Sequence, residues 1–352
     1  MGVVLGVVFH FLGGFASGSF YMAFKKVREW SWESYWVIGG IFSWLVIPPV
    51  AAALTLPGFS QLISEADGTV KGLTYLMGVL WGIGGLTYGL GIRYLGMSLG
   101  NSVILGYCAA FGSLIPPIFY NLYPQEGKVS FSEMMSSEGG RLVLLGVLVC
   151  LAGIFICGQA GMMKEKELPE AQKKKSIAEF NLVKGLVVAT ISGILSACFN
   201  FGIEAGKPMA EAAVRAGNNP LFQNNVTYVV LLWGGLTTNF IWSLLLNAKN
   251  KSFGDYVDGR KPLGVNYLFS AIAGTTWFMQ FFFYGMGESK LGNGASSWIL
   301  HMAFIILVSN GWGLSLNEWK GVSRRTKTTI GIGILTILAS VILVGYGNSI
   351  AG

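Results

Sequence analysis

Two histidines are the ionisable residues that lie deepest inside the apolar stretches of this chain. His10 falls in the apolar run 3–24 and His301 in the run 296–316, and the sequence holds no other histidine. An ionisable side chain inside a membrane is costly and usually belongs to an ion pathway, and imidazole titrates near neutral pH. Both histidines are therefore predicted to bind and release a proton. The alternative for each is a neutral imidazole that donates one hydrogen bond to a neighbouring helix.

Carboxylates near the ends of the apolar runs are further candidates. Glu33 begins the run 35–56, and it is the third residue predicted to take part in proton binding. Glu204 and Glu288 each close a later run. As functional groups they would accept a proton or pair with a basic residue, and the alternative for each is a solvated carboxylate at the membrane interface. The basic residues predicted to act as gate charges are Lys25, Arg93 and Lys207.

Aromatic and amide side chains share one face of an expected helix in the second half of the chain. Trp277, Gln280 and Tyr284 are spaced i, i+3 and i+7, and Trp81 and Tyr88 repeat the seven-residue spacing earlier in the sequence. Aromatic rings can cover the apolar face of a sugar while amides bind its hydroxyl groups. The alternative is an interfacial aromatic belt with ordinary helix packing. The predicted substrate-binding residues are Trp81, Tyr88, Asn101, Trp277, Gln280 and Tyr284.

The glycine-rich stretch that begins at Trp81 does not fit a nucleotide-binding loop. The dinucleotide fingerprint is G-x-G-x-x-G, and Thr87 or Tyr94 stands where the third glycine should be. The four cysteines all lie in apolar runs and form no C-x-x-C pair, so neither a disulfide nor a metal site is predicted. No nucleophile–base set indicates an enzyme, and no cofactor is expected beside the proton.

The composition places these residues inside a membrane. Hydrophobic residues make up 53% of the 352 positions and charged residues 12%, with a mean hydropathy of +0.58, whereas soluble domains carry about 25% charged residues. The basic residues sit in short clusters between apolar runs, so no nucleic-acid surface is predicted. A span needs about 20 apolar residues, and ten runs reach that length: 3–24, 35–56, 72–92, 99–120, 141–158, 183–203, 225–247, 265–287, 296–316 and 328–348. The sequence therefore predicts an all-α integral membrane protein with ten transmembrane helices.

An internal repeat relates the two halves of the chain. After a shift of 196 residues, Trp81 meets Trp277 and Tyr88 meets Tyr284, with matching glycines around them. Each half holds five runs, an odd number, so the second half enters the membrane from the opposite side. Such a 5+5 inverted-topology repeat recurs in secondary transporters. The predicted domains are a first five-helix repeat at 1–160, a charged cytoplasmic linker at 161–182 and a second, inverted repeat at 183–352.

The basic residues predict the orientation. Three quarters of the 24 Lys and Arg residues fall in the odd-numbered connections between the ten runs. Cytoplasmic connections carry the excess of Lys and Arg. The odd connections are therefore predicted to be cytoplasmic, and both termini to lie outside the cell membrane. The first run is not expected to be a signal peptide, because its positive charges follow it instead of preceding it.

Short motifs along the whole chain carry a resemblance to a known family. They are Phe24-Lys-Lys-Val27, Trp30-Ser-Trp-Glu33, Trp81-Gly-Ile-Gly84, Arg93-Tyr-Leu-Gly-Met-Ser98, Glu138-Gly-Gly-Arg141, Glu179-Phe-Asn181, Lys207-Pro-Met209, Gln280-Phe-Phe-Phe-Tyr284 and Ser297-Trp-Ile-Leu-His301-Met302. With them the chain closely resembles the L-rhamnose–proton symporter family of the drug/metabolite transporter superfamily. The resemblance implies ten spans in a 5+5 inverted repeat, a bacterial inner membrane, and proton-driven uptake of L-rhamnose and close analogues.

The resemblance also separates the candidate residues. His10, Glu33, Gln280 and His301 match the family pattern. The family has an amide and a histidine at the positions of Glu204 and Glu288, which demotes both acids as proton carriers, and Asn101 lacks a clear counterpart. The sequence thus predicts a proton–sugar symporter for L-rhamnose or a related deoxy-sugar or pentose, with both termini periplasmic and an undetermined oligomeric state. The alternatives are a drug or metabolite exporter of the same superfamily and a membrane sugar sensor.

Overall fold

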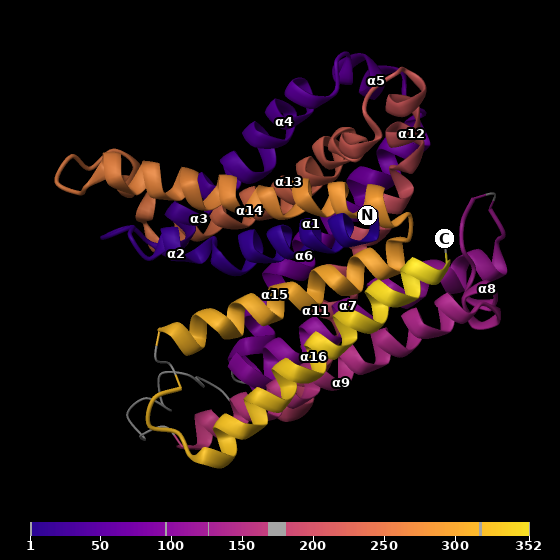
Figure 1. The fold of residues 1–352 in the computed structure, drawn as a ribbon. Coiled ribbons are helices and arrows are strands. Elements are labelled where there is room, and N and C mark those ends of the chain that lie inside the picture. Colours follow the sequence, from indigo (N-terminus) through magenta and orange to yellow (C-terminus); the bar gives the residue numbers. More distant parts are fainter. Residues whose placement is uncertain (1, 96, 126, 168–180, 317–318, 352) are drawn as a thin grey trace.

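Helices make up all of the regular secondary structure in the described part of this computed structural model (Figure 1). The description covers every residue except 1, 96, 126, 168–180, 317–318 and 352. The long helices are α1 (Gly2–Ser19), α6 (Gly68–Leu95), α7 (Met97–Leu122), α9 (Glu138–Glu167), α11 (Leu182–Ala205), α13 (Asn225–Asn250), α14 (Leu263–Leu291), α15 (Gly294–Ser315) and α16 (Arg324–Ala351). The shorter segments are α2 (Tyr21–Phe24), α3 (Trp32–Gly40), the π-helical η1 (Ile41–Val46), α4 (Ile47–Thr55), α5 (Phe59–Glu65), α8 (Phe131–Ser136), α12 (Lys207–Arg215) and the 3-10 turns η2 (Pro220–Phe222) and η3 (Ser252–Tyr256).

Nine stretches of the described residues are long and apolar enough to cross a membrane. They are Gly2–Phe24, Trp32–Thr55, Gly68–Ile92, Gly100–Leu122, Glu138–Glu167, Val183–Arg215, Pro220–Asn250, Gly294–Ser315 and Arg324–Ile350. The remaining predicted run, 265–287, lies in α14, which is 29 residues long and does not belong to the nine. Polar residues such as Asn266 and Gln280 lower the mean hydropathy of that helix. The protein is therefore an all-helical integral membrane protein with at least nine candidate spans.

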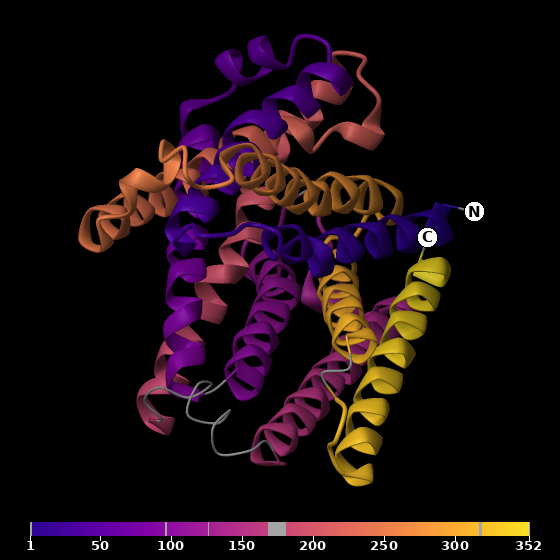
Figure 2. The same ribbon diagram turned by 90° about the vertical axis from the view of Figure 1, so that its left-hand side faces the viewer.

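Two groups of helices separate from one end of the molecule toward the other (Figure 1). One group contains α3, α4, α13 and α14, and the other contains α7, α9, α15 and α16. Between them, α1 packs on both α14 and α15, while α6 packs on α11, α13 and α7 (Figures 1 and 2). The beginning of α1 and the end of α16 lie near each other in both views, at the converging end on the right of Figure 1.

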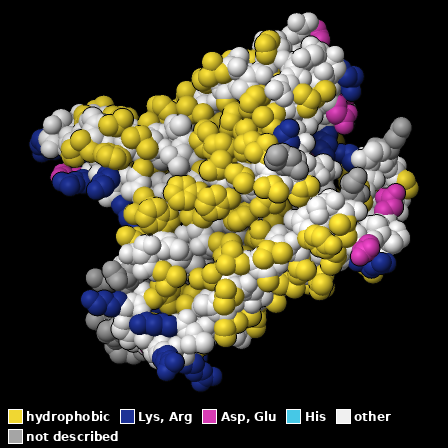
Figure 3. Space-filling model, in the orientation of Figure 1, with side chains coloured by type: hydrophobic (Ala, Val, Ile, Leu, Met, Phe, Trp, Pro, Cys, Tyr) yellow, Lys and Arg dark blue, Asp and Glu magenta, His cyan; other side chains and the backbone are white. Residues whose placement is uncertain are grey.

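The surface agrees with a membrane protein. Hydrophobic side chains cover the middle of the face shown in Figure 3, whereas Lys and Arg gather at its left and right ends. Many large apolar side chains point outward, with 81% of Leu54, 73% of Val183 and 71% of Ile342 exposed. Exposing such a surface to water would be unfavourable, so these helices require a hydrocarbon environment.

Two helices depart from the predicted boundaries in informative ways. The stretch that contains the predicted run 35–56 is interrupted by η1, a π-helical segment that only Ile47 separates from Pro48 and Pro49. The helix α9 continues through Glu167 and so covers the beginning of the predicted linker 161–182. Residues 168–180 of that linker lie outside the described residues.

Candidate functional site

A cavity of about 620 Å³ lies between the two groups of helices. It extends from Trp277, midway along α14, to Lys164 and Trp319, at the end where the groups separate. Eight of the nine long helices described above contribute to its wall, all except α16, and so do α3, η1 and the segment after α15. Five of the six residues predicted to bind substrate line this cavity: Trp81, Tyr88, Asn101, Trp277 and Gln280.

Three indole rings form one wall of the cavity. The rings of Trp81 and Trp277 lie 5.6 Å apart between centroids with their planes inclined by 36°. Trp44, from η1, stands edge-on to both, at 6.3 Å and 5.8 Å. Trp44 was not among the predicted site residues. Its signal in the sequence is a tryptophan in the middle of an apolar run, away from the membrane interfaces where tryptophan usually concentrates.

Amide and hydroxyl side chains line the cavity together with the aromatic rings. The Tyr88 hydroxyl donates a hydrogen bond of 2.7 Å to Oδ1 of Asn101. The Gln280 side chain donates from Nε2 to the carbonyl oxygen of Trp277, at 2.9 Å. The indole N–H of Trp36 donates to Oδ1 of Asn239, at 3.2 Å. The cavity therefore combines flat apolar surfaces with groups that can donate to and accept from hydroxyls.

The structure brings the two predicted proton-binding histidines together beside this cavity. The His10 and His301 rings lie 6.4 Å apart between centroids, and the Tyr284 ring lies 5.3 Å from each. Both imidazoles are fully buried. In the described part of the chain, none of their four ring nitrogens has a hydrogen-bond partner. His301 forms part of the cavity wall, whereas His10 does not.

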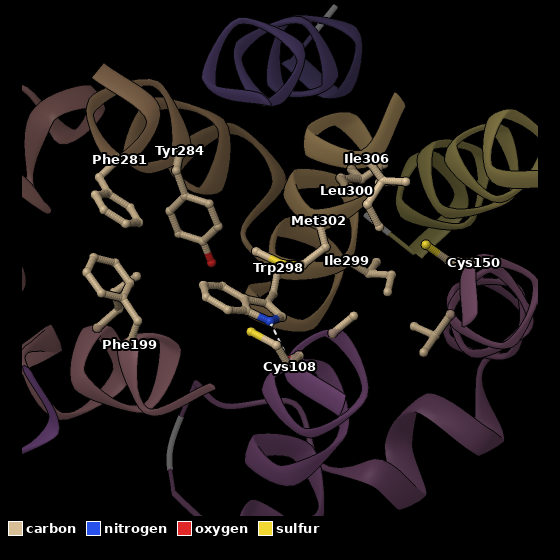
Figure 4. Packing of buried hydrophobic residues seen from close by; sticks show 14 of the residues in the cluster. Cys108, Cys150, Phe199, Phe281, Tyr284, Trp298, Ile299, Leu300, Met302 and Ile306 are labelled. Carbon is tan, nitrogen blue, oxygen red and sulfur yellow. Dashed lines mark hydrogen bonds between the residues drawn. The ribbon is translucent and has the colours of Figure 1, made fainter. Parts of the chain in front are cut away.

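Tyr284, the sixth predicted substrate-binding residue, does not line the cavity. It is fully buried between Phe281, Phe199 and Trp298 (Figure 4). Its hydroxyl donates to Oδ1 of Asn200 at 3.2 Å, and Nδ2 of Asn200 donates to the Gly112 carbonyl oxygen at 2.8 Å. The position of Tyr284 between the histidines and the anchoring role of Asn200 could not be assigned from the sequence.

Trp298 is a further cavity residue that sequence reasoning missed. Its ring stands edge-on to Tyr284 at 6.0 Å, and its indole N–H donates to the Cys108 carbonyl oxygen at 2.9 Å, the dashed line in Figure 4. The hydrogen bond ties α15 to α7 at the point where both border the cavity. Only its place in the motif that contains His301 set it apart in the sequence.

Glu33, the third predicted proton-binding residue, is not brought to the histidines. It does not line the cavity. Its side chain is 4% exposed, and Oε1 accepts hydrogen bonds from Asn250 at 3.0 Å and from the Ser252 hydroxyl at 2.6 Å. These contacts join the beginning of α3 to the end of α13, so the geometry gives Glu33 an anchoring position.

Asp255, which lies outside the candidate spans, belongs to the same cluster. Its Oδ2 accepts from the Ser31 backbone N–H at 2.8 Å and from the Ser34 hydroxyl at 2.7 Å, while Oδ1 pairs with Lys261. Burial would raise the pKa of the Asp255 carboxyl, but the hydrogen bonds from Lys261, Ser31 and Ser34 outweigh burial and hold the pKa below its usual value.

Four alternating charges form a network at the converging end of the molecule. Lys128 lies 2.9 Å from Glu204, and Lys207 lies 3.3 Å from both Glu204 and Glu288. Glu288 is 5% exposed and also accepts a 2.6 Å hydrogen bond from Asn224. Burial lowers the pKa of the Lys128 ammonium, in spite of the neighbouring Glu204. The predicted gate charge Lys207, at the beginning of α12, thus lies at the centre of a charge network and does not line the cavity.

The other two predicted gate charges are not placed in that network. Lys25 is exposed directly after α2. Arg93 belongs to α6, but its side chain lies outside the described residues. The part of the chain that the structure describes holds no group of three or more His, Cys, Asp or Glu that could bind a metal ion, and its four cysteines are free thiols.

Comparison with known proteins gives one consistent result. A family model described as L-rhamnose-proton symport protein (RhaT) matches residues 1–350. Proteins described as L-rhamnose-proton symporters are similar to this chain along its length. The one from Shigella dysenteriae serotype 1 is 39% identical, that from Cronobacter sakazakii 38% and that from Escherichia coli K12 37%. Each match extends over 350 residues and covers 98% of this chain and 98% of the relative.

Proposed function

The chain belongs to the L-rhamnose-proton symport protein family, and we propose that it takes up L-rhamnose, or a closely related deoxy-sugar, together with protons across the bacterial inner membrane. It is a secondary transporter and not an enzyme. The observation that carries the proposal is the cavity between the helix groups, where indole rings, amides and an imidazole share one wall. The proton is the coupling ion, and the bilayer and the sugar are the partners.

The chemistry of the cavity suits a deoxy-sugar. A pyranose ring has an apolar C–H face that packs on indole, which Trp81, Trp277 and Trp44 supply. Its hydroxyls need donors and acceptors, and Asn101 and Gln280 provide both. In a 6-deoxy-sugar such as L-rhamnose a methyl group stands in place of the hydroxymethyl group. It needs no polar partner, so it can rest on the aromatic wall.

The helix contacts support ten spans in a 5+5 inverted repeat, with α14 as the eighth span. The helix α6 packs on α11 and α13, and its counterpart α14 packs on α1 and α3, the counterparts of α11 and α13. Glycines also lie at both of these helix approaches. A Cβ on Gly78 would lie 3.2 Å from the Gly234 Cα, and one on Gly274 would lie 3.0 Å from the Gly39 Cα. Two halves related by a two-fold axis in the membrane plane would produce this exchange of partners.

The distribution of charge supports an orientation with both termini periplasmic. The cavity extends toward the end of the molecule that carries Lys164, Arg260 and Arg324, where Lys and Arg dominate on the left of Figure 3. That end would be cytoplasmic by the usual excess of positive residues. In this orientation the structure represents an inward-facing state, and the predicted linker 161–182 between the repeats 1–160 and 183–352 is cytoplasmic.

The charge network then closes the periplasmic side. Glu204 and Lys207 lie between the two helix groups, where they join Lys128, after α7, to Glu288, on α14. Separation of these groups would have to break the ion pairs, so the network favours the inward-facing state. Lys25 and Arg93 are proposed gate charges on the cytoplasmic side.

Sugar-induced alkalinisation tests the proposal. Purified protein is reconstituted into vesicles that trap a pH-sensitive dye, and L-rhamnose, L-fucose, L-lyxose and D-mannose are added in turn to the outside. A symporter carries protons inward with its sugar, so L-rhamnose should produce the largest alkalinisation of the outer medium and acidify the lumen. Vesicles without protein and addition of L-glucose are the controls.

Other outcomes would assign the alternative functions. Saturable binding of L-rhamnose without counterflow of labelled sugar would indicate a sensor. An absence of response to every sugar, together with proton-driven export of an apolar cation, would indicate a drug exporter. Either result would overturn the symport proposal.

A further inference from the structure

The two buried imidazoles have unmet hydrogen-bonding capacity. A neutral imidazole carries one N–H donor and one acceptor nitrogen. Neither group has a partner at His10 or at His301 in the described structure, and both side chains are fully buried. Unpaired polar groups in the interior are rare and costly, and those that persist are explained by a catalytic role or by a bound ion or water. Both histidines are therefore positioned for transient partners.

The hydroxyl of Tyr284, between the two histidines, can accept a hydrogen bond, but its own hydrogen is already donated. The Tyr284 hydroxyl donates to Oδ1 of Asn200, which is itself held by its hydrogen bond to the Gly112 carbonyl. The free lone pairs of the phenol oxygen remain as acceptors. The rings of His10 and His301 each lie 5.3 Å from the Tyr284 ring between centroids. After a small side-chain rotation, a protonated imidazole at either position would find the phenol oxygen close by as an acceptor.

The two histidines differ in what lies around them. His301 borders the cavity beside Gln280. His10 does not, and its ring lies against Gly287, where a Cβ would approach Nε2 to 2.7 Å. On α14, Gln280, Tyr284 and Gly287 lie on one side of the helix, because they are four and three residues apart. In this order they lead from the cavity toward the charge network. His10 is thus on the network side of His301.

We infer that the two histidines divide the work of symport: His301 contacts the sugar, and His10 holds the coupled proton, with Tyr284 between them. The inference rests on the proposed function. One proton binds to the free ring nitrogen of His10, forms an N–H bond, and leaves from the same nitrogen after the sugar has left. No bond in the sugar changes.

The surroundings of His10 explain how the two events are coupled. The titratable groups that face it are Tyr284 on α14 and His301 on α15, and Glu288 follows Gly287 on the periplasmic side; α1 has no other ionisable residue. A proton on His10 disfavours a second proton on His301 at 6.4 Å, so His301 stays neutral. Neutral His301 can both donate to and accept from sugar hydroxyls. Proton and sugar therefore favour each other's binding, as reciprocal linkage requires.

Matched substitutions separate the two roles. His10→Gln and His301→Gln are each reconstituted as the full chain, and two transport modes are measured with labelled L-rhamnose. Counterflow needs no net proton movement, whereas accumulation driven by a pH gradient does. His10→Gln should keep counterflow within about threefold of the wild type and lose at least about tenfold in accumulation, whereas His301→Gln should raise the KM of counterflow about tenfold or more.

A second measurement keeps the assignment testable if a variant transports poorly. L-rhamnose is added to the detergent-solubilised protein with a pH dye, and binding-linked proton uptake is recorded. The wild type should take up a proton, whereas His10→Gln and His10→Asn should bind sugar without doing so. Proton-coupled accumulation by His10→Gln, normal sugar affinity of His301→Gln, or one shared profile for both variants would overturn the division. If the wild type itself shows no sugar-dependent proton movement, the proposed function fails instead.

Discussion

The helices α6 and α14 carry the same Trp–Tyr spacing but place their tyrosines in different surroundings. Trp81 and Trp277 meet each other at the cavity. Tyr88 is partly exposed there and donates to Asn101, whereas Tyr284 is fully buried between two imidazoles. The repeated spacing therefore fixes where the rings stand along each helix, and the neighbouring helices decide what chemistry each tyrosine meets.

One substitution between the halves accounts for much of this difference. A shift of 179 residues aligns the predicted runs 3–24 and 183–203, with matching glycines, and it pairs His10 with Ala189. Ala189 is fully buried in a small apolar cluster against which Tyr88 packs. One half therefore presents an apolar neighbour where the other presents an imidazole. A symmetric scaffold can thus alternate between two states while carrying a single, asymmetric proton site.

The largest effect is expected from the part that the two halves share. Trp81→Ala and Trp277→Ala each remove one ring of the touching pair, and truncation of a packed tryptophan costs about 3–5 kcal/mol. Both variants should lower the melting temperature in detergent and weaken L-rhamnose binding to a similar degree, as measured by calorimetry. Trp→Phe at either position, which keeps a ring, is the matched control. Normal sugar affinity in one of the two alanine variants would show that the wall is not shared.

A smaller effect should distinguish the equivalent glycines Gly287 and Gly91. A Cβ on Gly287 would stand 2.7–2.8 Å from three atoms of the buried His10 ring, whereas a Cβ on Gly91 would meet the flexible end of Ile104 at 2.9 Å. Overpacking of a rigid interior costs about 1–3 kcal/mol. Gly287→Ala should therefore lower the melting temperature and accumulation, and Gly91→Ala should leave both near the wild-type values. Equal behaviour of the two variants would contradict the close packing of α1 on α14.

Removing the hydroxyl of Tyr284 or of Tyr88 should produce a smaller difference between the two halves than the glycine substitutions. Tyr284→Phe leaves the buried Oδ1 of Asn200 without its donor, which costs about 1–3 kcal/mol. Tyr88→Phe affects a partly exposed hydrogen bond to Asn101, where water can replace the hydroxyl. We expect a clear loss of thermal stability and of accumulation only for Tyr284→Phe. A Tyr88→Phe variant that is the less stable of the two would reverse the assignment of the buried and the open side.

The sequence predicted those site residues that share one face of a single helix. Trp277 and Gln280 share a face because of helical spacing, and the repeat extended that face to Trp81. Trp44 was not predicted because it lies on a π-helical turn, which shifts the side-chain register relative to a regular helix. The sequence shows neither that turn nor the face that the turn exposes to the cavity.

Contacts between distant helices were beyond the sequence. His10 and His301 were each predicted from their depth, but their meeting around Tyr284 depends on how α1 packs on α14 and α15. The same limit explains Glu33. A carboxylate at the beginning of a span has no sequence feature that separates a proton carrier from an anchor, and only its contacts with Asn250 and Ser252 reveal the second arrangement.

The smallest difference should appear where α6 and α14 begin. Asp67, exposed directly before α6, accepts hydrogen bonds from the backbone N–H groups of Thr69 and Val70, which lower its pKa. Asp255, before α14, is 4% exposed, and hydrogen bonds led by that from Lys261 lower its pKa against the effect of burial. Asn caps a helix about as well as Asp, so Asp67→Asn should change little.

Asp255→Asn removes the charge partner of Lys261 and should cost on the order of 1 kcal/mol at pH 7. Because the pKa of Asp255 is lowered in the folded protein, its stabilisation is complete above the unfolded value of about 3.9 and is lost as pH falls through the folded value. The difference in melting temperature between Asp255→Asn and the wild type should therefore be largest at pH 7 and shrink below about pH 4. A difference that stays constant down to pH 3 would show that the carboxylate is held by its hydrogen bonds alone, and that its charge contributes nothing to fixing the beginning of α14.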